Sequence, residues 1–225
     1  MSTDAKGSRS KEFHPAFEEY CEAIWELHED DIDVIQARIA ERLEVSRPAV
    51  SEMIRRMESE GLITIGSTIQ LTDAGRTLAE RVVRRHRLAE RFLTDILGLS
   101  WADAHTEAGK WEHVISEPVE HALSRVLGDP TTCPHGNPIP GANYRPPAAQ
   151  ALSELPIGSE FTVSRIPEEL EFEPGLLAFL EENSLQPGHS GMLTALSPDG
   201  TATVEIEGRH VGIGRFASER ILVTT

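Results

Sequence analysis

The feature that most constrains this chain is a change of hydrophobic pattern across a proline- and glycine-rich segment, residues 128–150. Before this segment, apolar residues recur at helical spacings of three and four; after it, short runs with strand-like patterns follow one another. The segment itself predicts an ordered crossing followed by a linker. A chain of 225 residues is long enough for two or three compact units, and we expect a domain boundary near residue 147.

The first part of the chain predicts a helix-turn-helix followed by a hairpin. The helices are expected to begin after Pro15 and to cover residues 35–43 and 48–59. Ser46 is placed to cap the third helix, because its side chain can accept a hydrogen bond from a free backbone N–H. Residues 62–71 alternate around a Gly-Ser-Thr turn, as a β-hairpin does. We therefore predict a winged helix-turn-helix domain over residues 11–77.

The remaining pattern predicts a helical unit and a small β unit. Further helices are expected from about residue 73 to 97, over 102–115 and over 118–127, and strands over 160–166, 190–196, 201–206, 210–213 and 220–223. We assign residues 78–147 to the helical unit and residues 148–225 to a small β-barrel. The expected fold class is thus mainly α with a small β part.

The charge distribution identifies the part of the chain that can bind nucleic acid. The net charge of -16 argues against a polyanionic partner, because affinity for DNA comes largely from cations that meet phosphates. Residues 44–91, however, carry nine arginines against seven acidic side chains. Lysine occurs only at Lys6, Lys11 and Lys110, and such an acidic, lysine-poor composition resembles that of proteins from salt-loving organisms. A DNA surface is therefore expected within 44–91.

Cysteine usage and hydropathy bear on the compartment. Cys21 and Cys133 are far apart and give neither a disulfide framework nor a four-thiolate zinc site. Residues 1–9 are polar, and no run of about 18 apolar residues occurs. We expect a cytoplasmic protein without a membrane span or a secretory signal.

The third helix is the expected recognition helix, because the second helix of a helix-turn-helix enters the major groove. Its arginines can reach guanine or phosphate, Ala49 can meet a thymine methyl group and Glu52 can accept from cytosine. The candidate DNA-binding residues are Arg38, Ser46, Arg47, Pro48, Ala49, Ser51, Glu52, Arg55 and Arg56. The alternative is a winged helix that serves only protein contacts.

Histidines and carboxylates on apolar helix faces indicate a metal. His105, Gly109, Glu112 and His113 fall on one side of the helix expected over 102–115. His86 and Glu90 lie one turn apart on the preceding helix. A buried, unpaired carboxylate costs several kcal/mol or forces protonation, so a cation is expected beside it. Imidazole and carboxylate together suit manganese, ferrous iron, nickel or zinc, whereas a single histidine is more often an ordinary core residue.

With these residues in place, the chain resembles the diphtheria-toxin-repressor family of metal-dependent regulators. The matching segments run in order over residues 16–141 and include Arg38-Ile39-Ala40-Glu41-Arg42-Leu43, Pro48-Ala49-Val50-Ser51, Gly75-Arg76-Thr77-Leu78-Ala79, His86-Arg87-Leu88-Ala89-Glu90-Arg91, Trp111-Glu112-His113-Val114 and Gly136-Asn137-Pro138-Ile139-Pro140-Gly141. The resemblance implies a winged helix, a helical dimerisation and metal-binding domain, and a C-terminal SH3-like domain. It also implies a homodimer that binds double-stranded operator DNA and represses metal-uptake genes.

The resemblance further implies two metal sites per subunit. The regulatory site would use Glu19, Gly109, Glu112 and His113, and the ancillary site His86, Glu90, His105 and Glu173. Two departures affect the regulatory site: Glu19 replaces a thioether ligand, and Gly109 stands at a thiolate position. Glu22 corresponds to a second carboxylate of the manganese-sensing branch. We therefore expect Mn(II), with Fe(II) as the alternative.

Two other classes of function are weighed against a metal-dependent repressor. A hydrolytic metalloenzyme would need an open coordination position and a substrate pocket, and the sequence shows neither a nucleophile motif nor an oxyanion motif. A metal-storage or adaptor protein would use the SH3-like domain for partner contacts and would not bind upstream DNA. The sequence favours a non-enzymatic repressor.

Overall fold

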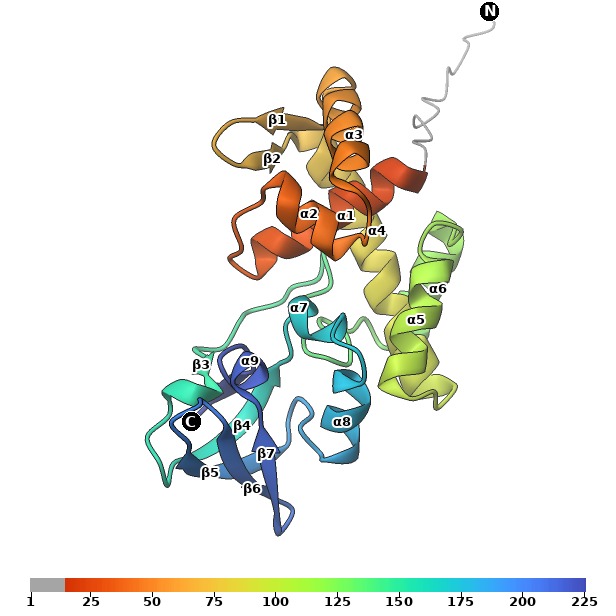
Figure 1. Ribbon diagram of the computed structural model, residues 1–225. Helices are drawn as coiled ribbons and strands as arrows, with labels where there is room; N and C mark the ends of the chain where they lie inside the picture. The colour runs from red at the N-terminus through yellow and green to blue at the C-terminus, as the bar shows by residue number, and fades with distance from the viewer. Residues whose placement is uncertain (1–14) are drawn as a thin grey trace, which may run out of the picture.

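The computed structural model describes residues 15–225. Residues 1–14, which include the polar N-terminus and the first four residues of the expected DNA-binding domain, lie outside the described part. Figure 1 shows a helical N-terminal region with a hairpin at its side, a long helix leading away from it, and a C-terminal β region beneath. Within residues 15–225, no helix has both the length and the apolar character of a membrane span.

The N-terminal region is a winged helix. Its elements are α1 (Pro15–Glu29), α2 (Gln36–Arg42), α3 (Arg47–Ser59), β1 (Ile63–Ile65) and β2 (Ile69–Leu71). The expected cap forms, because Ser46 Oγ accepts a hydrogen bond from the backbone N–H of Ala49 at 3.4 Å. The hairpin packs directly on the next helix: a Cβ atom on Gly75 would lie 2.0 Å from the carbonyl oxygen of Leu62. Only glycine allows this approach.

The middle of the chain forms three helices. They are α4 (Asp73–Arg91), which continues as the π-helical turn η1 (Phe92–Ile96), α5 (Trp101–Trp111) and α6 (Glu117–Val126). Thr72 caps α4 by accepting from the N–H of Gly75 at 3.2 Å. The helix expected over 102–115 ends earlier than predicted, because α5 stops at Trp111. The chain then turns, and α6 begins at Glu117, directly before Pro118. His113 therefore lies beyond the helix.

The C-terminal region is a six-stranded antiparallel sheet with short helices, which is the expected SH3-like part. Its strands are β3 (Gln150–Ala151), β4 (Glu160–Arg165), β5 (Ser190–Leu196), β6 (Ala202–Ile206), β7 (Arg209–Ile213) and β8 (Leu222–Thr224), in the order β3-β8-β4-β5-β6-β7. Its helices are η2 (Leu152–Glu154), α7 (Glu168–Glu171), α8 (Leu176–Glu182) and α9 (Arg215–Ser218). The short α7 lies between the sheet and the N-terminal helices (Figure 1).

Buried apolar residues form three clusters. One joins α1 to α3, the hairpin and the start of α4; a second joins the end of α4 to α5 and α6; the third fills the C-terminal region. Trp101 is the exception, because it begins α5 yet packs in the C-terminal cluster. We keep 11–77, 78–147 and 148–225 as the proposed domain limits.

Candidate metal centres and DNA-binding surface

Three buried side chains from three helices meet where the N-terminal region contacts α4 and α5. Glu22 comes from α1, His86 from α4 and Glu112 from the end of α5, and their ligand atoms all lie within 4.8 Å of one another. His86 Nδ1 lies 2.5 Å from Glu112 Oε2. Glu22 Oε1 is buried without a hydrogen-bond partner among residues 15–225. We call these three residues the junction cluster.

The charges of the junction cluster fit a cation. Burial raises the pKa of Glu22 well above its usual value, and the neighbouring Glu112 carboxylate raises it further. Burial opposes the charged form of His86, but Glu90 and Glu112 raise the pKa of this imidazole well above its usual value. In the absence of another positive charge, the surroundings thus favour the protonated forms of Glu22 and His86. A divalent ion would supply that charge and would use the orphaned oxygen of Glu22.

The other residues expected in the regulatory site lie around this cluster. His113 Nε2 is 3.2 Å from Glu112 Oε1, but 4.0 Å from Glu19 Oε1, and Glu19 is exposed. His113 Nδ1 contacts Glu18 at 2.9 Å, a carboxylate that Arg81 also binds, and this hydrogen bond raises the pKa of His113. Gly109 lines a cleft of about 250 Å³ beside the cluster, and apart from its own helix no described part of the chain lies within 4 Å of the place of a Cβ atom there.

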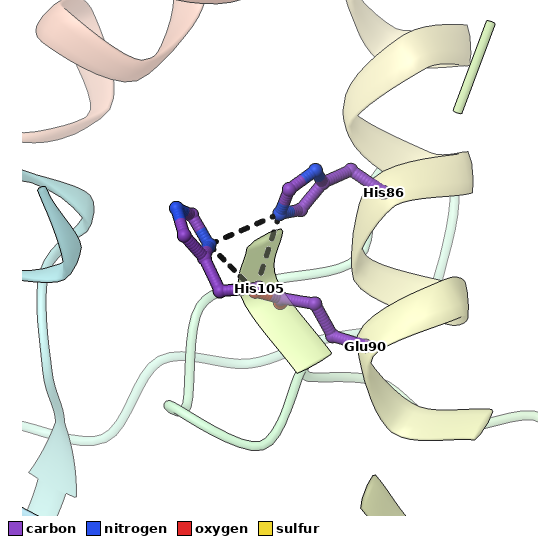
Figure 2. A group of neighbouring side chains, drawn as sticks. All are labelled: His86, Glu90 and His105. Atoms are coloured by element: carbon purple, nitrogen blue, oxygen red, sulfur yellow. Dashed lines mark hydrogen bonds and ion pairs between the residues drawn. The ribbon is translucent and has the colours of Figure 1, made fainter. Parts of the chain in front are cut away.

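A second cluster shares His86. Figure 2 shows the side chains of His86 and Glu90 from α4 and His105 from α5 pointing toward one another. His86 Nε2 lies 3.2 Å from Glu90 Oε1 and 3.3 Å from His105 Nδ1, and His105 Nδ1 lies 3.0 Å from Glu90 Oε1. Because its Nδ1 faces Glu112 and its Nε2 faces Glu90, the His86 ring connects the two clusters.

The C-terminal carboxylate of the second cluster is Glu171, which corrects the expectation for Glu173. Glu171 Oε2 lies 3.1 Å from His105 Nδ1, whereas Glu173 is exposed. The reason is local: Glu171 ends the short helix α7 on its buried side, and the chain turns outward at Phe172. Burial, with Glu168 beside it, raises the pKa of Glu171 to about 7. Against burial, Glu171 and Glu90 raise the pKa of His105 to about 10.

Sequence reasoning also missed two residues of the crossing segment. Cys133 and His135 are buried beside Glu90, and the three form a further group with ligand atoms within 4.8 Å of one another. Against burial, Glu171 and Glu90 raise the pKa of His135. Burial and the same carboxylates raise the pKa of the Cys133 thiol well above its usual value. The Cys-x-His spacing was the available signal, but a segment without periodicity does not say which way its side chains point.

The candidate DNA-binding residues lie on the exposed side of α2, α3 and the turn between them. Arg38, Ser46, Arg47, Pro48, Ala49, Glu52, Arg55 and Arg56 are exposed, and Ser51 is half-buried. Val50, Ile54 and Met57 occupy the opposite face and are buried. Arg55 donates a hydrogen bond to Ser51 at 3.2 Å. This placement leaves the guanidinium groups of α3 accessible to phosphates and base edges.

Two family models match the chain. One, described as "Iron dependent repressor, N-terminal DNA binding domain", matches residues 12–66, and one described as "Iron dependent repressor, metal binding and dimerisation domain" matches residues 72–141. The iron-dependent repressor IdeR of Mycobacterium tuberculosis is 41% identical over 206 residues, which cover 86% of this chain and 89% of that protein. The diphtheria toxin repressor of Corynebacterium diphtheriae is 50% identical over 144 residues, which cover 63% of this chain and 59% of that protein.

Solved structures extend the match to the C-terminal sheet. A manganese-dependent transcriptional repressor in complex with manganese superimposes with a TM-score of 0.84 and 32% identity, covering 93% of this chain and 99% of that chain. The IdeR structure from T. acidophilum gives a TM-score of 0.76 and 30% identity, covering 97% and 99%. On the clustered ligands, the exposed recognition helix and these similarities, the chain belongs to the diphtheria-toxin-repressor family of metal-dependent transcriptional repressors.

Proposed function

We propose that this repressor responds to Mn(II), with Fe(II) as the alternative, through two metal sites per subunit. The regulatory site consists of Glu22, Glu112 and His113, with Glu19 drawn in from the surface and water at the place left by Gly109. The ancillary site consists of His86, Glu90, His105 and Glu171. The observation that carries the proposal is the junction cluster, in which buried carboxylates from separate helices lie together and Glu22 has an orphaned oxygen.

The ligand atoms of the regulatory site support manganese. They are carboxylate oxygen and imidazole nitrogen, and among the described residues neither a cysteine nor a methionine lines the cleft beside the junction cluster. Hard ligands of this kind suit Mn(II), whereas sulfur would select softer or more strongly bound ions. The 41% identity to an iron-dependent repressor keeps Fe(II) as the second candidate.

The proposed control of DNA binding follows from where the ligands lie. Glu22 belongs to α1 of the winged helix, while Glu112 belongs to the unit built on α4 to α6. When bound, the ion would supply the positive charge that lets these carboxylates approach without protons. Glu22 and Glu112 would then hold the winged helix in one orientation, and the hinge population would shift toward it. In a dimer, that orientation fixes the spacing of the two α3 helices on a pseudo-palindromic operator in the cytoplasm.

An exposed apolar surface supports the homodimer. Val119 and Val126 lie seven residues apart on one face of α6 and are 49% and 63% exposed, and Ile96 and Leu97 at the end of η1 are each 52% exposed. Large apolar side chains left exposed on a subunit are typical of subunit interfaces. We propose that α6 and η1 contribute to the dimer interface.

The decisive experiment separates metal-dependent DNA binding from dimerisation. We expect Glu112→Gln and His113→Ala to abolish manganese-dependent binding to a duplex selected by the manganese-loaded protein, while light scattering still shows a dimer. Glu107→Gln, a change at a half-buried position on α5 outside both proposed sites, is the matched control and should bind as the unchanged protein does. Full manganese-dependent binding by both variants in a mobility-shift assay would refute the proposal. Failure of the unchanged protein to select any duplex would favour a storage or adaptor role.

A further inference from the structure

The end of the short helix α7 contacts the helix-turn-helix directly. The guanidinium of Arg42 lies over the ring of Phe172, the residue that follows α7, with 4.4 Å between Cζ and the ring centroid. Arg42 is the last residue of α2, and the recognition helix α3 begins next, at Arg47. A side chain of the C-terminal region thus reaches the helix that leads into the recognition helix.

Few other partners satisfy the charge of Arg42. Its side chain is only 5% exposed, and its Nη1 donates a hydrogen bond to Glu26 Oε2 at 3.0 Å. Its Nη2 is buried without a hydrogen-bond partner in the described part of the chain. An aromatic face attracts a cation, and more strongly where water is excluded. Phe172 therefore helps to fix the end of α2.

The same ring contacts the proposed ancillary site. The rings of Phe172 and His105 meet edge to face, with centroids 5.4 Å apart and planes at 89°. Glu171, directly before Phe172, places its Oε2 3.1 Å from Nδ1 of the same histidine. Phe172 thus touches a proposed ligand of the ancillary site as well as the helix-turn-helix.

The beginning of α7 is attached to the winged helix without any metal. Asp30, which follows α1, accepts a hydrogen bond from the backbone N–H of Glu169 at 3.0 Å. Its other oxygen lies 2.7 Å from Nη2 of Arg165, and its side chain is 3% exposed. Because this end of α7 is fixed, the place of Phe172 depends on what holds Glu171 at the other end.

We propose that Phe172 is a positioning residue that couples occupancy of the ancillary site to the recognition helix, an inference that rests on the proposed function of that site. An ion held by Glu171 and His105 would fix the end of α7, and Phe172 would then hold Arg42 and the end of α2. The ancillary ion would thereby act on DNA binding through the C-terminal region. The regulatory ion, in contrast, would act through Glu22 of α1.

Removal of the ring tests this role without opening a core, because Phe172 is 47% exposed. We expect Phe172→Leu to bind the two proposed manganese ions per subunit in isothermal titration, yet to bind the selected duplex about fivefold to tenfold more weakly with manganese. Phe172→Tyr keeps an aromatic face and should restore binding to within about twofold. Phe216→Leu is the matched control, because it removes another exposed ring that contacts Arg220 within the C-terminal region.

The dependence on metal distinguishes coupling from simple packing. A passive contact would stabilise the protein equally with manganese and with chelator, whereas coupling predicts that Phe172→Leu lowers the urea midpoint mainly with manganese. In a Glu90→Gln background, which lacks a proposed ancillary ligand, Phe172→Leu should hardly change DNA binding further.

Three results would overturn the role of Phe172: unaltered DNA binding by Phe172→Leu, an equal loss in Phe172→Tyr, or an undiminished loss in the Glu90→Gln background. A single manganese ion per subunit in the unchanged protein would instead refute the two-site proposal on which this inference rests. The titration reports that failure separately from the DNA-binding assay.

Discussion

Two of the contacts between the winged helix and the rest of the molecule differ in where their positive charge comes from. The junction cluster brings Glu22 close to Glu112, with the imidazole of His86 beside them. Further along the chain, the carboxylate of Glu29 lies 2.6 Å from the guanidinium of Arg87, and that of Asp30 lies 2.7 Å from the guanidinium of Arg165. We call this group the arginine junction. The arginine junction also includes Glu168, 3.4 Å from Arg87.

The difference shows how one helix can carry both a permanent and a conditional contact. His86 and Arg87 are neighbours on α4, yet His86 lies beside Glu22 of α1 and Arg87 binds Glu29 at the end of α1. In the arginine junction every carboxylate has a guanidinium partner, and Arg87 helps to lower the pKa of Glu168 to about 2 although burial opposes this. In the junction cluster burial raises the pKa of Glu22. The first contact has its positive charges within the chain, and the second calls for an added cation.

Breaking the arginine junction should give the largest effect. Arg87 is fully buried, so Arg87→Met leaves Glu29 and Glu168 without their common counterion, and removal of one partner of a buried pair costs about 3–5 kcal/mol. We expect this loss in the free energy of unfolding, measured with urea, both with manganese and with chelator. Arg38→Met, which removes an exposed pair with Glu41, should cost about 0–1 kcal/mol. Equal stability of the two variants would contradict the comparison.

Changing the junction cluster should, by contrast, alter stability only when manganese is present. Glu22→Gln imitates the protonated carboxyl group that burial favours, so the metal-free protein should unfold at nearly the same urea concentration as before. Manganese at 100 times its dissociation constant stabilises a protein by about 2.7 kcal/mol, and the variant should lose most of that gain. Calorimetric thermal scans with and without manganese measure it. A full manganese response in Glu22→Gln would show that this carboxylate is no ligand.

The smallest expected effect is on the pH dependence of manganese binding. Because the pKa of Glu22 is raised, the folded metal-free protein holds a proton that manganese must displace, so affinity should rise from pH 6 to pH 8 by up to about tenfold per pH unit for each proton released. Isothermal titration in buffers of different ionisation enthalpy counts those protons. Glu22→Gln should release fewer. An unchanged proton count would assign the titration to other ligands.

The sequence anticipates the regular parts of the fold because each has a local cause. Ser46 and Thr72 cap helices where expected, and the buried stripe of α3 follows from Val50, Ile54 and Met57. The end of α5 does not follow in the same way. Helical spacing continues to residue 115 in the sequence, while in the structure the helix ends at Trp111 and a turn carries His113 toward Glu18.

The site is anticipated less well wherever its residues come from irregular segments. His86, Glu90 and His105 lie on long helices, so their spacing predicts their meeting. Glu171 ends a four-residue helix, too short for a hydrophobic period to distinguish it from Glu173. His135 and Cys133 lie in a segment of prolines and glycines whose path depends on packing against β4. Their convergence on Glu90 is a tertiary result that no local pattern encodes.

Trp101 makes the C-terminal domain difficult to remove without disturbing the helical unit. Its indole belongs to the C-terminal hydrophobic cluster and contacts His135 with ring centroids 4.5 Å apart, while its backbone N–H donates to Glu181 on α8 at 3.0 Å. A truncation at the linker would remove the C-terminal residues that bury Trp101 and leave its indole exposed on α5. The shortened chain would expose an apolar patch that favours aggregation. In the full chain, the fluorescence of Trp101 would report whether the C-terminal domain is docked or undocked.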